Sequence, residues 1–121
     1  MNTFAKKIAL FLFTSTAFLL PVHAQTNFPE RTVKFVVPYP PGGFNDTLAR
    51  VSSEKLAKVW NQPTLVENKP GGNTTIGNSY VAKSAPDGYT ILITPLPFSA
   101  LPGLYGDKLP YDAIKDFDPL V

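Results

Sequence analysis

The sequence predicts an α/β domain with a parallel sheet and flanking helices. Short β-branched runs alternate with helix-like segments in the order strand, helix, strand, helix, strand. Such alternation favours parallel strands joined by right-handed crossovers. Two of the strands, Val33–Val37 and Ile91–Ile93, are nearly continuous apolar runs, as expected of strands covered on both faces. With 121 residues, the chain is expected to form at most one domain.

The first residues are typical of an export signal. Two lysines precede the apolar run Ile8–Leu20, which is shorter than the roughly 20 residues of a membrane helix. A small residue, Ala24, follows where signal peptidase cuts. We therefore expect residues 1–24 to be a cleaved signal peptide and residues 25–121 to be periplasmic. An uncleaved anchor or an unusual core helix is the alternative.

Charge and composition exclude several classes of function. Without the two lysines of the signal peptide, eleven basic residues become nine, equal to the nine acidic residues, so no nucleic-acid partner is expected. The chain has no cysteine, and its single histidine, His23, lies in the predicted signal peptide. Without histidine the mature chain has no base for a Ser-His-Asp triad, and without cysteine it has no thiolate site. An ordinary zinc site would lack its usual histidine and cysteine ligands. We expect no catalytic residue, no metal and no cofactor.

The first strand and the first helix flank a loop rich in proline and glycine. The strand Val33–Val37 is stopped by Pro38, and the next residues suit neither a strand nor a helix. Apolar residues then fall near one helical stripe: Leu48, Val51, Leu56, Val59 and Trp60. This spacing predicts a helix over residues 46–60, with Asn45 or Asp46 as its N-cap.

The same order of elements follows in the second half of the chain. A strand over Thr64–Glu67 leads through a glycine loop to a helix over Thr74–Lys83. Gly77 weakens that helix by about 1 kcal/mol relative to alanine, which indicates close packing at this position. A turn at residues 85–88 introduces the third strand, Tyr89–Thr94.

The tail is less regular. We expect an extended loop over Pro95–Gly103 and a helical turn over Ala113–Phe117. The chain stops at residues 118–121, at the threshold of what looks like another strand, and an unpaired apolar strand is a poor end for a domain. We therefore expect either part of a longer protein or a truncated remnant with no independent binding activity.

Two glycine-rich loops stand where a strand gives way to a helix. Sheets of this kind bind ligands at the carboxyl ends of their strands, beside helix N-termini whose free N–H groups and dipole favour anions. Neither loop fits a dinucleotide or phosphate-loop pattern, and plain turn chemistry is the alternative. The expected ligand-binding residues are Pro41, Gly42, Gly43, Phe44, Asn45 and Asp46 in the first loop and Gly71, Gly72, Asn73 and Thr74 in the second.

Several short motifs carry a resemblance to a known family. They are VVPYPPGG at 36–43, VENKPG at 66–71, IG at 76–77, APDGYT at 85–90, LPYD at 109–112 and KDF at 115–117. In these motifs the chain resembles the tripartite tricarboxylate transporter substrate-binding proteins, also called Bug receptors. The resemblance implies the opening part of the first lobe of a two-lobed, type II periplasmic binding protein. It also implies a small organic acid as ligand, and membrane transporter subunits or a sensor domain as partner.

The resemblance also implies where a ligand would lie. In the family, the loops that match Pro40–Asp46 and Pro70–Thr75 hold a ligand carboxylate, partly through ordered waters. The loop that matches Pro95–Pro102 lines the same cleft.

This chain departs from the family pattern in both glycine loops. The first usually reads Gly-Gly-Gly-[Thr/Ser]-Asp, whereas Phe44 and Asn45 precede the aspartate here. The second usually has further small residues where Asn73 and Thr74 stand. The identity of the ligand therefore does not carry over. A secreted hydrolase that uses a serine of the Ser52-Ser53 pair or a carboxylate is the alternative from another class, and no histidine partner is available to it.

Overall fold

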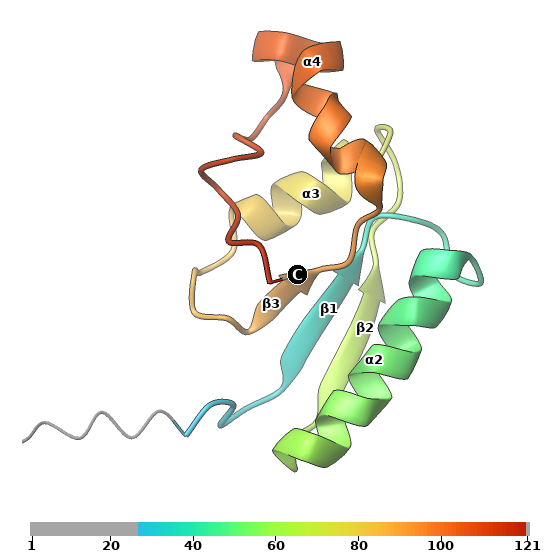
Figure 1. Ribbon diagram of the computed structural model, residues 1–121, viewed down its shortest axis with the longest axis vertical. Helices are drawn as coiled ribbons and strands as arrows, with labels where there is room; N and C mark the ends of the chain where they lie inside the picture. The colour runs from blue at the N-terminus through green and yellow to red at the C-terminus, as the bar shows by residue number, and fades with distance from the viewer. Residues whose placement is uncertain (1–26, 121) are drawn as a thin grey trace, which may run out of the picture.

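The computed structural model describes residues 27–120 and confirms the predicted fold class (Figure 1). The predicted signal peptide, residues 1–24, lies outside the described residues. Three parallel strands form one sheet in the order β2-β1-β3. The main elements are β1 (Val33–Val37), α2 (Phe44–Trp60), β2 (Thr64–Asn68), α3 (Thr75–Ala82) and β3 (Thr90–Leu92).

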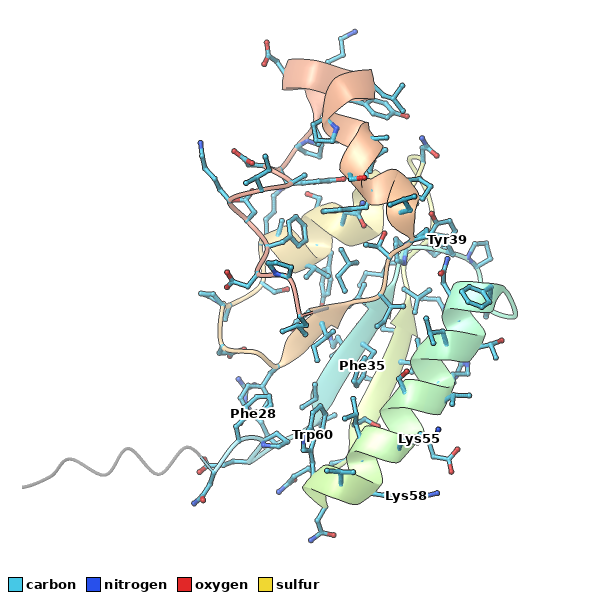
Figure 2. The ribbon with its side chains drawn as sticks, in the orientation of Figure 1. Phe28, Phe35, Tyr39, Lys55, Lys58 and Trp60 are labelled. Atoms are coloured by element: carbon cyan, nitrogen blue, oxygen red, sulfur yellow. The ribbon has the colours of Figure 1, made fainter. Side chains whose placement is uncertain are left out.

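The two main helices cover opposite faces of the sheet. The chain moves outward from β1 to β2 and then back across β1 to β3, so right-handed crossovers place α2 and α3 on different sides. Thr64 at the start of β2 is hydrogen-bonded to Ser53 of α2. Lys34 of β1 is hydrogen-bonded instead to Tyr80 of α3. The central strand β1 is therefore covered twice, and Val33, Phe35, Val36 and Val37 form the core (Figure 2).

Helix α2 packs on the sheet through small residues and not through its apolar stripe. Leu48, Val51 and Val59, which support the helix in the sequence, are exposed, and Val59 keeps 78% of its surface. The inward positions are Asp46, Ala49 and Ser53. Small side chains allow close approach, and the Ser53 hydroxyl donates to Thr64 Oγ1 at 2.7 Å.

The helix boundaries differ slightly from those predicted. Helix α2 begins at Phe44, with Gly43 as an N-cap that has no side-chain hydrogen bond, so the predicted cap at Asn45 or Asp46 is wrong. Asp46 instead lies in the first turn and accepts a hydrogen bond from an amide that precedes the helix. The predicted end at Trp60 is confirmed, since Asn61 adopts a left-handed conformation there.

The connection after β3 corrects the predicted extended loop over Pro95–Gly103. A 3₁₀-helix, η1 (Leu96–Ala100), continues directly into α4 (Leu101–Tyr105), and η2 (Gly106–Lys108) follows. Pro97 and Pro102 stand in the first turns of η1 and α4. Proline is compatible with those positions because amides there have no intrahelical acceptor.

Aromatic side chains fasten the tail and the opposite end of the sheet. Tyr111 and Phe117 pack with Phe98 of η1, at centroid distances of 5.1 to 6.1 Å. The predicted helical turn over Ala113–Phe117 is closed by the bond from Asp116 N to Asp112 O. At the amino ends of the strands Phe28 contacts Trp60, far from Tyr39, which follows β1 (Figure 2).

The close packing inferred at Gly77 is confirmed. A Cβ atom at this position would lie 2.8 Å from the carbonyl oxygen of Lys69 and 2.8 Å from Pro38 Cβ. The absence of a side chain thus lets α3 lie directly against the segment that follows β1.

We predict that Gly77→Ala lowers the free energy of unfolding by about 1–3 kcal/mol, because backbone atoms must move to admit the methyl group. The matched control is Gly103→Ala in α4, where the new Cβ meets nothing within 4 Å. That change should leave stability unchanged or raise it by up to about 1 kcal/mol, as helix propensity favours alanine. Urea titration followed by circular dichroism compares the two, and equal stabilities would contradict the packing role of Gly77.

Candidate anion-binding site

The two glycine loops lie side by side beyond the carboxyl ends of β1 and β2 (Figure 1). We call residues 38–43 the first glycine loop and residues 69–74 the second glycine loop. Lys69 N donates to Val37 O at 2.8 Å, and the side-chain amide of Asn68 donates to Tyr39 O at 3.1 Å. These bonds extend the pairing of β1 with β2 into the loops and fix one loop against the other.

A buried carboxylate holds this junction together. Asp46, 4% exposed, accepts hydrogen bonds from Gly42 N at 2.9 Å and from Arg50 Nε at 3.0 Å, both through Oδ2. Its other oxygen, Oδ1, accepts from the side-chain amide of Asn68 at 3.0 Å. One side chain of α2 thus binds the first glycine loop, its own helix and the last residue of β2.

The same contacts keep Asp46 ionised. The Arg50 guanidinium is the largest cause that lowers the pKa of the Asp46 carboxyl, and the N–H groups of Gly42 and Asn68 lower this pKa further. Both oxygens are occupied within the protein, and the charge is balanced by Arg50. Asp46 therefore does not present a free negative charge to a ligand at the start of α2.

Free amides mark the N-terminus of α2. The bond from Thr47 N to Gly43 O is the first of the helix, so the preceding amides of Phe44, Asn45 and Asp46 have no intrahelical acceptor. They carry the positive end of a 17-residue helix dipole. Gly42 takes φ of +90°, a conformation that favours glycine, and turns the chain into this start.

The second glycine loop turns through a run of left-handed residues. Gly71, Gly72, Asn73 and Thr74 all have positive φ, at 117°, 56°, 50° and 74°. Asparagine tolerates this region, but a β-branched residue such as threonine is an outlier there. Strain of this kind persists only where the surroundings impose it, and it is frequent at ligand sites.

The connection after β3 reaches the same edge. The side-chain amide of Asn73 donates to the hydroxyl of Tyr105 in α4 at 3.0 Å. All three segments that follow the strands thus meet at one end of the sheet (Figure 1).

The predicted site residues do not all face the same way. Asp46 is buried and turned inward, Asn45 and Thr74 are half-buried, and the other members are exposed: Pro41, Gly42, Gly43, Phe44, Gly71, Gly72 and Asn73. The Phe44 ring keeps 81% of its surface. The structure brings both loops to one edge, with Asp46 beneath them.

Three participants are missing from the sequence prediction of the site: Arg50, Asn68 and Tyr105. Arg50 follows Asp46 by four residues, and this spacing is a signal for an ion pair on a helix. Asn68 is a polar residue at the last position of a strand, next to the second glycine loop. Nothing local in the sequence connects Tyr105 with Asn73.

Basic side chains near the loops are already paired. Arg50 binds Asp46, and Lys69 binds Glu67 with 2.7 Å between Nζ and Oε1. Lys34 shares the same Glu67 carboxylate, and the Lys69 and Lys34 ammonium groups lower the pKa of Glu67. The edge therefore offers an anion mainly backbone N–H groups.

Residues 27–120 contain no cluster of histidine, cysteine or acidic side chains suited to a metal ion. Within the same range, no helix has the length and apolar character needed to cross a membrane.

Known structures share this fold over part of their length. The chain aligns with the periplasmic binding protein BugD at 40% identity and a TM-score of 0.70, over 76% of this chain and 30% of that one. It aligns with MatC from Rhodopseudomonas palustris, solved with bound malate, at 40% identity and a TM-score of 0.69, over 76% of this chain and 31% of that one. An R. palustris protein solved with adipate matches at 36% identity and a TM-score of 0.66, over 71% of this chain and 29% of that one. Over the aligned residues, the chain has the fold of part of a periplasmic binding protein.

The sequence comparison identifies the family. Residues 48–121 match the tripartite tricarboxylate transporter family receptor, and the chain belongs to this family. Protein BugT of Bordetella pertussis is 38% identical over 111 residues, which cover 90% of this chain and 34% of BugT. The chain thus spans about a third of the length of the relatives it matches.

We predict that removal of the Asp46 charge destabilises the fold and changes its response to acid. A carboxylate whose pKa is lowered by folding contributes stability above its unfolded pKa of about 3.9 and loses that contribution as pH falls through the folded value. The free energy of unfolding of the wild type should therefore fall below about pH 4. Asp46→Asn should be less stable at pH 7 and lose less on going to pH 3.

The matched control is Glu54→Gln. Glu54 and Lys58 form a pair with the same i,i+4 spacing, but both side chains are exposed. Exposed pairs add little to stability, so this variant should resemble the wild type in urea titrations at both pH values. Equal losses in the two variants would contradict the junction role of Asp46.

Proposed function

We propose that this chain is the carboxylate-binding part of a periplasmic solute receptor. The observation that carries the proposal is the junction at Asp46, which fixes the first glycine loop to the end of β2 beside the free amides of α2. Helix N-termini with free N–H groups bind carboxylates and phosphates without a side-chain cation. Arg50 balances the charge of Asp46, and internal donors occupy its oxygens, so this charge opposes such a ligand less.

The ligand we propose is a small organic acid. Two of the structures that match this chain hold dicarboxylates, malate in MatC and adipate in the other R. palustris protein. The residues proposed to contact the ligand are Pro41, Gly42, Gly43, Phe44, Asn45, Gly71, Gly72, Asn73 and Thr74. Asp46, the tenth member of the predicted set, does not contact the ligand in this proposal but holds Gly42 in place through a hydrogen bond.

The site is proposed to bind and release its ligand without chemical change. Ser53, a candidate nucleophile of the hydrolase alternative, is buried in α2 and donates its hydroxyl proton to Thr64. A serine without an adjacent base is a weak nucleophile. The family consists of receptors, and this supports a binding function over catalysis.

Export and partners follow from the same assignment. The predicted signal peptide at residues 1–24 would deliver the chain to the periplasm, where two of the matched proteins are placed by their names. There the receptor would hand its ligand to the membrane subunits of a tripartite tricarboxylate-type transporter, or report it to a sensor domain.

We predict weak binding by this chain alone. It spans about a third of its relatives, and the family resemblance implies that a second lobe closes over the ligand. Isothermal titration calorimetry of residues 25–121 with malate or adipate should therefore show no micromolar affinity. Micromolar binding would show that the site is complete without a second lobe.

We predict that Gly43→Val abolishes such weak binding as exists. Gly43 has an extended conformation, and its Cβ would meet nothing within 4 Å, so valine fits the fold but projects into the open space beside the amides. Millimolar malate or adipate should shift the backbone amide signals of Gly42, Gly43, Gly71 and Gly72 in the wild type, as followed by ¹H–¹⁵N NMR. The shifts should vanish in the variant and persist in Gly103→Ala.

The neutral diamide of adipic acid is the ligand control, since it has the same chain without charge. Shifts of equal size with the diamide, or unchanged binding in Gly43→Val, would count against a carboxylate at the first glycine loop.

A further inference from the structure

A buried amide lies beneath the second glycine loop. Asn78 of α3 is fully buried. Its Nδ2 donates to Thr74 Oγ1 at 3.2 Å and to the Tyr111 hydroxyl at 2.9 Å. Its Oδ1 has no hydrogen-bond partner among residues 27–120.

This arrangement is costly for a residue that serves only to fill space. A buried acceptor without a partner destabilises a fold, and an apolar side chain of similar size would avoid the loss. Both hydrogens of Nδ2 are used, one towards the loop and one towards the tail. The asparagine is therefore explained by what its N–H groups hold.

The backbone of its first partner, Thr74, is strained. Thr74 precedes α3 with φ of +74°, a conformation that a β-branched residue rarely adopts. Asn78 holds this residue twice, because its backbone N–H also donates to Thr74 O at 3.1 Å. The two bonds restrain the backbone and the side chain of Thr74 together.

The direction of the side-chain bond determines what Thr74 can do. Because Thr74 Oγ1 accepts a hydrogen bond from Asn78, the hydrogen of the Thr74 hydroxyl must point elsewhere. Thr74 is half-buried, so one side of the residue remains open to solvent. The hydroxyl hydrogen of Thr74 is therefore not used in the bond with Asn78.

We propose that Asn78 is a positioning residue for ligand binding: it holds Thr74 in the left-handed conformation and leaves the Thr74 hydroxyl free to donate to a ligand carboxylate. The ligand role rests on the function proposed above. Tyr111 fixes the orientation of the amide from the other side, and Tyr111 is itself packed against Phe98 and Phe117. The tail of the chain thus takes part in the site without touching the ligand.

The first test needs no ligand. Asn78→Leu removes both donors and the unpaired acceptor, so it should fold, but Thr74 should leave the left-handed conformation. The three-bond coupling between the amide and α protons of Thr74 reports φ directly in NMR spectra. An unchanged coupling in the variant would overturn the positioning role, whether or not any acid binds.

The second test uses malate and adipate at millimolar concentration, with the glycine amide shifts as readout. Asn78→Leu and Thr74→Val should each weaken binding by about tenfold, as expected for one hydrogen bond to a charged group. Thr74→Ser keeps the hydroxyl and should recover most of the binding that Thr74→Val loses. Because the two residues act through one bond, the double variant Thr74→Val, Asn78→Leu should lose no more than either single variant.

The two proposals fail in different ways. Absence of shifts in the wild type with either acid would remove the carboxylate site and the ligand role of Thr74 together. If the shifts seen in the wild type persist in Thr74→Val, the carboxylate site stands. The claim that the Thr74 hydroxyl donates to the ligand is then wrong. Additive losses in the double variant would overturn the link between Asn78 and Thr74.

Discussion

The buried carboxylate of Asp46 is the interaction on which this edge of the molecule depends. Parallel strands end together at one edge of a sheet, and the regular ladder of backbone hydrogen bonds stops close to that edge. Asp46 supplies acceptors to the amide of Gly42 and to Asn68 at the end of β2, and Arg50 balances its charge. The first glycine loop is thereby fixed to β2 and α2 before any ligand is present. Such preorganisation lowers the ordering cost of binding.

The same carboxylate resolves an electrostatic conflict at the start of α2. An acidic residue in the first turn is favourable to the helix dipole but would compete with an anionic ligand for the same amides. In this structure the acid reaches back to Gly42 and sideways to Asn68. The amides of Phe44 and Asn45, which precede the first intrahelical bond, are left to an external acceptor. A negatively charged residue and an anion site can thus occupy one helix terminus.

Much of the fold could be predicted from the sequence, because it depends on local patterns. The apolar run of β1, the alternation of elements and the glycine at position 77 each reflect burial or close approach at their own positions. The pattern was ambiguous in two places. Prolines suit an extended segment and a first helical turn equally well, so η1 and α4 were missed. The apolar stripe of α2 marked a helix correctly, but the residues that face the sheet are small or polar. For the site, the loops were predictable, whereas bonds such as that from Asn73 to Tyr105 depend on tertiary structure.

The departures from the family motif have different consequences in the two loops. In the first, only Gly42 has a positive φ; Gly43 is extended and Phe44 is already helical, so a phenylalanine at that point costs the backbone nothing. In the second, Asn73 and Thr74 both lie in the left-handed region, and threonine is poorly suited to it. A neighbour must then oppose the relaxation of Thr74, and Asn78 is the residue that contacts both its oxygen atoms. The loss of small residues in the second loop and the buried amide beneath it are therefore two parts of one local solution.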